Sequence, residues 1–300
     1  MADSPKPAPS AEGGWADETL HPSVRFGFRV DKLLYEQKSD EWHVQLIENA
    51  AFGKVLLLDG VTQVTSRDEF VYHEMMSHVP LLAHGAARAV LIVGGGDCGM
   101  AEEVLKHASV ERLTQVEIDR SVVDFSKEHF SDFNAPVFTD PRFDLVIADG
   151  ARFVRETGQR FDVILVDSTD PIGPGAVLFT EEFYRNCRRC LTPGGILVTQ
   201  NGVPFFQEDE LVSSIRHFAS LFADSSAYVA AVPTYIGGHM ALGFATDNTG
   251  LRQTPLDTLT RRFETARIDT RYYTPEVHQA AFALPRFIRD AVEKGRGKRG

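Results

Sequence analysis

The sequence predicts an α/β protein in which a doubly wound, largely parallel sheet follows a small N-terminal antiparallel β-domain. Three observations support this fold class. Four apolar stretches rich in β-branched residues occur between residues 89 and 175, helix-like segments separate them, and each stretch ends in Gly or Asp. The order is therefore βαβαβαβ. The stretches are AVLIVGGGDCGM, LTQVEID, FDLVIADG and FDVILVDSTDPIGPG.

The N-terminal part has a different pattern. Residues 1–14 are rich in Pro, Ala, Ser and Gly without an apolar period, which predicts a disordered leader. Short alternating runs then continue to about residue 65 and predict an antiparallel β-unit. Residues 68–82 have the apolar spacing of a helix that bridges the two parts. We place this β-domain and its bridging helix at residues 15–78.

Residues 79–292 are assigned to the doubly wound domain. After the βα repeats, LTPGGILVTQNG predicts another strand, residues 207–222 a helix, and AYVAAVP and HMALGFATD the closing strands. The ending EKGRGKRG, residues 293–300, is basic and glycine-rich, which predicts a flexible tail.

Composition excludes several classes of protein. A net charge of −11 argues against nucleic-acid binding, which needs a basic surface. The three cysteines are too few and too irregular for a disulfide scaffold and indicate a reducing compartment. The chain has no secretory signal pattern and no apolar run long enough to cross a bilayer. A cytoplasmic protein with no membrane partner is expected.

Acidic side chains follow each of the predicted parallel strands. They are Asp97, Glu117, Asp149, Asp167 and Asp170. A parallel sheet carries its ligands at the carboxyl ends of its strands, so these side chains are expected to line one pocket. So much negative charge predicts a small cationic ligand.

The glycine loop after the first of these strands narrows the choice between classes of ligand. Residues 94–99, GGGDCG, match G-x-G-x-x-G between a strand and a helix, which on its own is a weak signal for a dinucleotide. Asp97 would repel a pyrophosphate at the helix N-terminus. Glu117 is suited to a ribose diol and Asp149 to an adenine amino group. These carboxylates favour a phosphate-free S-adenosyl ligand over NAD.

The chain from Trp15 to Ala291 strongly resembles the spermidine synthases, the polyamine aminopropyltransferases. The motifs that carry the resemblance are DGVTQVTSRDEFVYHEM, VGGGDCGM, VEID, DPRFDLVIADGARF, DSTDPIGPG, PTYIGGHM and RYYTPEVHQAAFALP. It implies a Rossmann-like sheet of the S-adenosylmethionine-methyltransferase type. It also implies aminopropyl transfer from decarboxylated S-adenosylmethionine to putrescine, giving spermidine and methylthioadenosine. The donor is then a co-substrate, no cofactor is permanently bound, and a homodimer or homotetramer is expected.

The resemblance also implies roles for individual residues. The donor site comprises Asp97 at the amino end, Glu117 at the ribose and Asp149 at the adenine, with Gly95, Gly150, Pro174 and Trp42. Proton transfer falls to Asp167, with Tyr72 and Tyr235. The diamine site comprises His73, Asp170, Trp15 and Tyr235.

The chemistry needs a base such as Asp167. An alkylamine with a pKa of about 10.4 is protonated at neutral pH, and removing its proton costs roughly 4 kcal/mol. A carboxylate beside the reacting centre can take that proton, while the donor sulfonium favours the neutral amine. Asp170 is expected to bind rather than react. As an alternative, Asp167 and Asp170 could be turn residues before Pro171.

Other residues have simpler interpretations. Asp119 is expected to cap a helix. His73 and His78 are spaced H-E-x-x-x-H and point away from each other on a helix, so no metal site is expected there. Cys187 and Cys190 are expected to be structural, one packed in the core and the other exposed.

Two positions depart from the family pattern. Cys98 stands where the family usually has Gly, and is either a tolerated small residue or an acidified, reactive thiol at a helix N-terminus. Trp42 stands where an early strand usually carries a nucleoside-facing Gln. It either stacks on the ligand or packs against the β-domain. Gln45 cannot replace that Gln because an offset of three points to the opposite face of a strand.

Three other functions remain open. One is transfer to another amine, such as cadaverine, agmatine or spermidine. Another is methyl transfer from full S-adenosylmethionine, although Asp97 would repel its carboxylate. The last is a polyamine-binding homologue with altered catalysis.

Overall fold

The computed structural model describes residues 12–297 except 19, 22, 40–41 and 169–172. The chain divides into two compact units, one formed by residues 1–69 with Val232–Gly238 and the other by residues 70–231 and 239–300. Asp170 lies outside the described residues, so its expected place in the diamine site stays a prediction.

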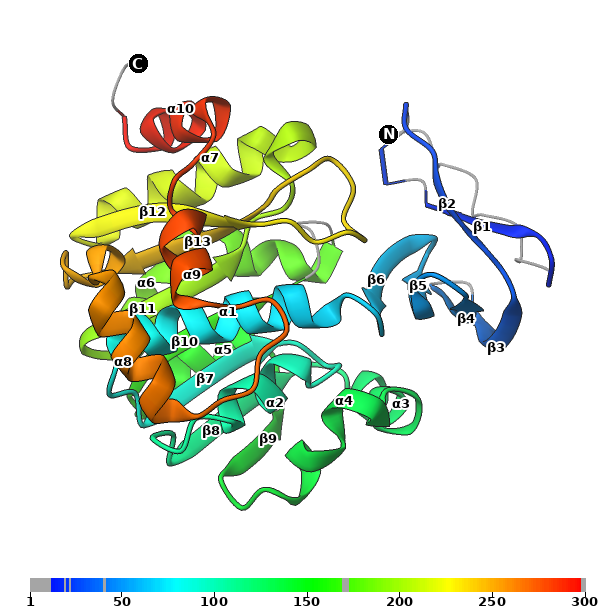
Figure 1. The fold of residues 1–300 in the computed structure, drawn as a ribbon, viewed down its shortest axis with the longest axis horizontal. Helices are drawn as coiled ribbons and strands as arrows, with labels where there is room; N and C mark the ends of the chain where they lie inside the picture. The colour runs from blue at the N-terminus through cyan, green and yellow to red at the C-terminus, as the bar shows by residue number, and fades with distance from the viewer. Residues whose placement is uncertain (1–11, 19, 22, 40–41, 169–172, 298–300) are drawn as a thin grey trace. The chain divides into compact units, whose positions relative to one another are not determined.

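The smaller unit is built from antiparallel strands (Figure 1). A hairpin joins β1 (Trp15–Glu18) to β2 (Phe26–Arg29). A second sheet has the order β3-β4-β5-β6, and the strands are β3 (Lys32–Lys38), β4 (His43–Asn49), β5 (Gly53–Leu58) and β6 (Val61–Thr65). Phe28, Ile47, Val55 and Leu57 lie in its core. Alternation of apolar and polar residues along these strands buries one face, as the sequence predicts.

The larger unit contains a sheet that, among the described residues, has seven strands in the order β12-β13-β11-β10-β7-β8-β9. All pairs from β11 to β9 are parallel, and β13 pairs antiparallel with both its neighbours. Its strands are β7 (Ala89–Gly94), β8 (Arg112–Glu117), β9 (Phe143–Ile147), β10 (Phe161–Asp167), β11 (Leu191–Gln200), β12 (Asp224–Ala230) and β13 (Met240–Thr246). The predicted fold class is confirmed.

Helices connect and cover these strands (Figure 1). They are α1 (Glu69–His84), α2 (Gly99–Leu105), α3 (Arg120–His129), α4 (Ser131–Asn134), α5 (Gly150–Glu156), α6 (Glu181–Cys190), α7 (Pro204–Leu221), α8 (Leu256–Ala266), α9 (Pro275–Ala281) and α10 (Arg286–Gly295), with 3-10 turns η1 (Ala135–Thr139), η2 (Gly173–Phe179) and η3 (Leu251–Gln253). Asp119 caps α3 by accepting from Ser121 N–H, as predicted. Helices α5, α6, α7 and α10 pack successively against one another.

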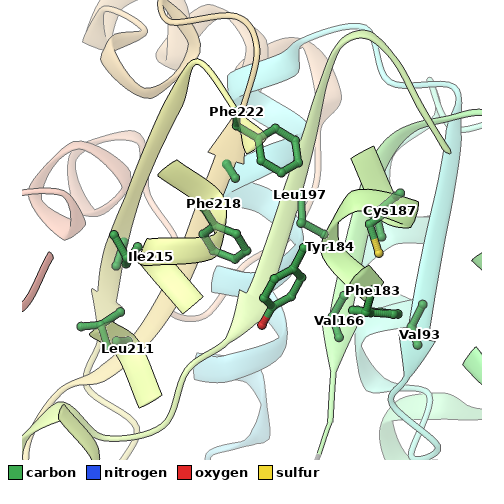
Figure 2. Close-up of a cluster of buried hydrophobic side chains, with 14 of the residues drawn as sticks. Val93, Val166, Phe183, Tyr184, Cys187, Leu197, Leu211, Ile215, Phe218 and Phe222 are labelled. Carbon is green, nitrogen blue, oxygen red and sulfur yellow. The ribbon is translucent and has the colours of Figure 1, made fainter. Parts of the chain in front are cut away.

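The main core lies between this row of helices and the sheet (Figure 2). Tyr184 of α6 and Phe218 of α7 meet edge to face with ring centroids 4.8 Å apart. The Tyr184 hydroxyl is hydrogen-bonded to the Ser214 hydroxyl, which satisfies its polar end. Strand residues such as Val166 and Leu197 complete the cluster. The strands can be continuously apolar because helices cover both faces of a parallel sheet.

Three expectations at the domain limits need correction. The boundary after residue 78 falls inside α1, which belongs to the larger unit from Phe70 because Met75, Met76 and Val79 are buried there. The leader of residues 1–14 is ordered at its end, where Val30 N–H donates to Gly14 O at 2.9 Å.

The predicted tail also begins later than expected. Helix α10 includes Glu293, Lys294 and Gly295, because the buried Gly295 packs closely against Ile215. Lys294 pairs with Glu208 at 3.0 Å, and Arg296 donates to Ser225 O at 2.8 Å. Charged residues that looked like a flexible end are therefore held by contacts far away in the sequence.

Candidate active site

Four of the predicted site carboxylates follow neighbouring strands of the larger sheet. The strand order β10-β7-β8-β9 brings Asp167, the glycine loop with Asp97, Glu117 and Asp149 to one edge. Because these strands are parallel, their carboxyl ends meet there. The register pairs Asp167 with Gly94, so the end of β10 lies beside the start of the loop.

The glycine loop depends on backbone conformations that favour glycine. Gly94 and Gly95 have φ values of 85° and 66°. A side chain on Gly94 would collide with the backbone carbonyl of Asp167, and Gly95 N–H donates to that carbonyl at 3.2 Å. The loop and the end of β10 are therefore in direct backbone contact, which sets the position of Asp97 relative to Asp167.

Asp97 is held as a charged group. Its Oδ1 accepts from Gly99 N–H at 2.8 Å, and its Oδ2 lies 3.2 Å from His73 Nε2. Burial acts to raise the pKa of Asp97, but His73 and the Gly99 N–H lower it below the ordinary value. His73 itself is 2% exposed and comes from α1. A side chain on Gly99 would collide with the His73 ring, so glycine is required there.

The surroundings of Asp167 shift its pKa in the opposite direction, upward. Burial raises its pKa to about 6, the nearby negative charge of Asp97 raises it as well, and the Tyr72 hydrogen bond opposes the shift. Tyr72 Oη donates to Asp167 Oδ1 at 2.7 Å. A carboxylate with such a pKa is ionised at neutral pH and is still basic enough to accept a proton.

The carboxylates at the other two strand ends, Glu117 and Asp149, accept hydrogen bonds from nearby backbone N–H groups. Glu117 Oε1 accepts from Asp119 N–H at 3.1 Å, and burial raises the pKa of Glu117. Asp149 caps α5 by accepting from Arg152 N–H at 2.8 Å. Gly150 begins α5 where a side chain would collide with Val93. Pro174 lies in η2.

Three predicted site residues belong to the smaller unit. Tyr235 Oη donates to Gln63 O at 2.6 Å. Trp15 lies on β1 and is 61% exposed. Trp42 lies just before β4 rather than on the strand, and its backbone N–H donates to Ser39 Oγ at 3.0 Å. Their roles toward a ligand stay predictions.

The segment that carries Tyr235 is tied to the smaller unit by a buried carboxylate. Asp68 Oδ2 accepts from Thr234 N–H at 2.7 Å and from the Thr234 hydroxyl at 2.5 Å, while Asp68 Oδ1 accepts from the Thr65 hydroxyl. This anchors a segment that is distant in the sequence.

Cys98 is a buried structural residue. It has φ 62° at the N-terminus of α2, a left-handed conformation. Burial, and then the charge of Asp97, raise the pKa of its thiol. The alternative of an acidified, reactive thiol is therefore wrong. Cys187 and Cys190 are both buried, so the expectation that one is exposed is also wrong, because α6 packs against other elements at both positions.

The two histidines of α1 have different partners. His73 pairs with Asp97, whereas His78 Nδ1 lies 2.9 Å from His107 Nε2. Within the described parts of the chain, no cluster of His, Cys, Asp or Glu has a geometry that could hold a metal ion. The same residues include no helix that is long and apolar enough to span a bilayer.

Two buried amides of the site were missed by the sequence analysis. Gln115 Nε2 donates to Gly94 O and Gly95 O, and Asn134 Nδ2 donates to Asp97 O. Gln115 could have been found, since it is polar within an apolar strand and lies two positions before Glu117, on the same face. Nothing in the local pattern marks Asn134, because its partner is a distant backbone carbonyl.

Comparison with known proteins identifies the chain's relatives. Residues 69–254 match the spermine/spermidine synthase domain, and residues 14–66 match the spermidine synthase tetramerisation domain. The polyamine aminopropyltransferase of Ruegeria sp. (strain TM1040) is 54% identical over 92% of this chain and 97% of its own. Polyamine aminopropyltransferase 1 of Pseudomonas aeruginosa is also 54% identical over 92% of this chain and 97% of its own.

Solved structures are similar over nearly the whole chain. A spermidine synthase in complex with the transition state analogue AdoDATO has a TM-score of 0.87 and 35% identity, covering 96% of this chain and 97% of its own. The spermidine synthase from Thermotoga maritima has a TM-score of 0.84 and 33% identity, covering 97% of this chain and 96% of its own.

Proposed function

The chain belongs to the spermine/spermidine synthase family, the polyamine aminopropyltransferases, and we propose that it converts putrescine to spermidine. The donor is decarboxylated S-adenosylmethionine and the second product is methylthioadenosine. The observation that carries the proposal is Asp167, a half-buried carboxylate with a pKa of about 6 beside a charged Asp97. The spermidine synthase that binds AdoDATO supports the same donor class.

The reaction requires one bond to form and one to break. The amine nitrogen of putrescine attacks the aminopropyl carbon next to the sulfonium, a C–N bond forms, and the C–S bond breaks. The sulfur keeps the electron pair of that bond and leaves as a neutral thioether. The nitrogen must lose one proton, and Asp167 accepts it while Tyr72 orients the carboxylate.

The donor is held by groups of complementary charge. We assign the aminopropyl ammonium to Asp97, the ribose diol to Glu117 and the adenine amino group to Asp149. The half-buried, ionised Asp97 favours a donor without a carboxylate and opposes full S-adenosylmethionine. Further donor contacts are assigned to Gly95, Gly150, Pro174 and Trp42.

The diamine is proposed to contact His73, Asp170, Trp15 and Tyr235. An acidic residue away from the reacting nitrogen would pair with the distal ammonium of a diamine. This arrangement favours putrescine over a monoamine of the same length, because the second charge would otherwise be left without a counter-ion.

A product assay tests the proposal. Purified protein is incubated with decarboxylated S-adenosylmethionine and putrescine, cadaverine, agmatine, spermidine or butylamine, and methylthioadenosine and the polyamine product are measured. Parallel measurements use full S-adenosylmethionine as the donor and follow the binding of putrescine by calorimetry. We expect putrescine to give the highest kcat/KM and butylamine to react poorly.

The other outcomes distinguish the alternatives. Preference for another diamine changes the acceptor assignment only. Equal turnover with full S-adenosylmethionine would contradict the donor assignment. Binding of putrescine without methylthioadenosine release would identify a polyamine-binding homologue.

A further inference from the structure

Gln115 is a fully buried polar residue on β8. Its side chain lies on the same face of the strand as that of Glu117, two positions later. Gln115 Nε2 donates to Gly94 O at 3.0 Å and to Gly95 O at 2.5 Å. A primary amide nitrogen carries two N–H donors, and here each one has a carbonyl of the glycine loop.

The amide orientation follows from its neighbours. If the side-chain oxygen were turned toward the loop, it would face two carbonyl oxygens and neither contact could be a hydrogen bond. The two carbonyls belong to residues with positive φ, at the point where the chain turns away from the sheet. Gln115 therefore adds a side-chain donor to both carbonyls, and Gly95 O also accepts from Cys98 N–H at 2.9 Å.

Asn134 holds the other end of the same loop. It is fully buried, and its Nδ2 donates to Asp97 O at 2.9 Å and to Ser126 O at 3.0 Å. Both supports are neutral amides. A lysine or arginine in either place would add a competing cation beside Asp97, whereas an amide fixes the backbone without adding a charge.

We infer that Gln115 is a positioning residue for the aminopropyl donor. Its amide fixes the backbone at Gly94 and Gly95, which aims the Asp97 carboxylate at the donor's ammonium group. This inference rests on the proposed function. The prediction that separates it from a purely structural role is selectivity, because only a ligand that reaches Asp97 should lose affinity when Gln115 is replaced.

Two ligands test this selectivity. Decarboxylated S-adenosylmethionine has the ammonium, and methylthioadenosine has the nucleoside without it. We expect Gln115→Met to weaken binding of the donor about tenfold in calorimetry, the size expected for the loss of two neutral hydrogen bonds. Methylthioadenosine should bind within about twofold of wild type. A comparable loss for both ligands, or no loss for either, would overturn the inference.

A matched control comes from the preceding residue. Thr114 is buried on the other face of β8, and within the described structure its hydroxyl has no hydrogen-bond partner. Thr114→Val also removes a buried polar group from β8 but does not alter a contact with the glycine loop. Both ligands should therefore bind this variant as they bind the wild type. Loss of donor affinity in this variant would indicate that any change in β8 disturbs the site.

A double-mutant cycle tests whether Gln115 acts through Asp97. In an Asp97→Asn background, Gln115→Met should no longer change the donor affinity, and an unchanged tenfold effect would contradict the inference. If Gln115→Met does not fold, Asn134→Leu is measured instead and should show the same selective loss; equal loss of both ligands would again overturn it. A wild type that binds neither ligand would refute the proposed function itself.

Discussion

Two neighbouring aspartates are suited to different tasks by their surroundings. Asp97 receives a backbone N–H and a histidine, which keep its pKa low despite burial. Asp167 receives one tyrosine hydroxyl, and burial together with the charge of Asp97 raises its pKa to about 6. Asp97, which stays charged, is suited to bind a cation, and Asp167 is suited to exchange a proton near neutral pH.

Replacing Asp167 should remove proton transfer. Asp167→Asn is expected to lower kcat by about 10²–10⁴ with a smaller effect on donor affinity. In the wild type, kcat should fall as the pH drops through about 6, because protonated Asp167 cannot accept a proton. Steady-state rates between about pH 5 and 10 measure both effects. If the rate of Asp167→Asn stays unchanged across that range, deprotonation is not the role of Asp167.

The same substitution should stabilise the folded protein. Because the folded pKa of Asp167 lies above the unfolded value of 3.8, the native state binds the proton more tightly and stability falls as the pH rises from about 4 to 6. Asp167→Asn resembles the protonated form at every pH. We expect a gain of about 1–3 kcal/mol at pH 8 and none below about pH 4, measured by denaturant unfolding. A gain that does not depend on pH would contradict this account.

At the level of elements, helix α1 contributes side chains both to the candidate site and to the packing of a distant segment. Tyr72 and His73 contact the site aspartates. Glu74, on the next position, is 1% exposed and accepts the backbone N–H groups of Arg271, Tyr272 and Tyr273 at 2.7–2.9 Å. One carboxylate therefore holds the connection between α8 and α9 against α1.

Removing this charge should destabilise the protein. Glu74→Gln is expected to lower the free energy of unfolding by about 2–4 kcal/mol, since three charge-assisted bonds are weakened and one amide donor faces backbone donors. Thermal unfolding with the exposed Glu128→Gln as a control measures the difference. A melting temperature equal to that of the control would show that Glu74 is not needed to hold the connection.

The cysteines of α2 and α6 should be unreactive in the folded protein. Cys98, Cys187 and Cys190 are all buried, and burial raises the pKa of each thiol. We expect a thiol reagent at pH 8 to label none of them rapidly and to label all three after unfolding. Rapid native labelling of Cys98 would restore the hypothesis of a reactive thiol at the start of α2.

At the scale of the whole molecule, the smaller unit is the part expected to mediate assembly. Its residues 14–66 match a domain described as a tetramerisation domain, and we propose that the chain forms a homo-oligomer. Light scattering across a dilution series should give a mass near twice or four times the 33.3 kDa of one chain. A mass of one chain at every concentration would contradict this.

Sequence patterns alone predict the order of elements and the edge of the sheet that carries the site. Four continuous apolar strands, each followed by an acidic residue, are enough to predict a parallel sheet with acidic strand ends, because both features depend on residues close together in the chain. The glycine-rich loop between the first of these strands and its helix was visible for the same reason, whereas the positive φ values of Gly94 and Gly95 were not. Motif resemblance supplied Tyr72, His73 and Tyr235, which periodicity alone does not distinguish from packing residues.

Which side chain supports which part of the site follows from contacts that exist only in the folded chain. Tyr72 reaches Asp167, Gln115 reaches the glycine loop and Asn134 reaches Asp97 O across separations of 95, 20–21 and 37 residues. The membership of Val232–Gly238 in the smaller unit and the burial of Cys190 were decided in the same way. Local patterns record which face of an element is apolar, whereas a hydrogen-bond partner or a pKa depends on what the completed fold brings into contact.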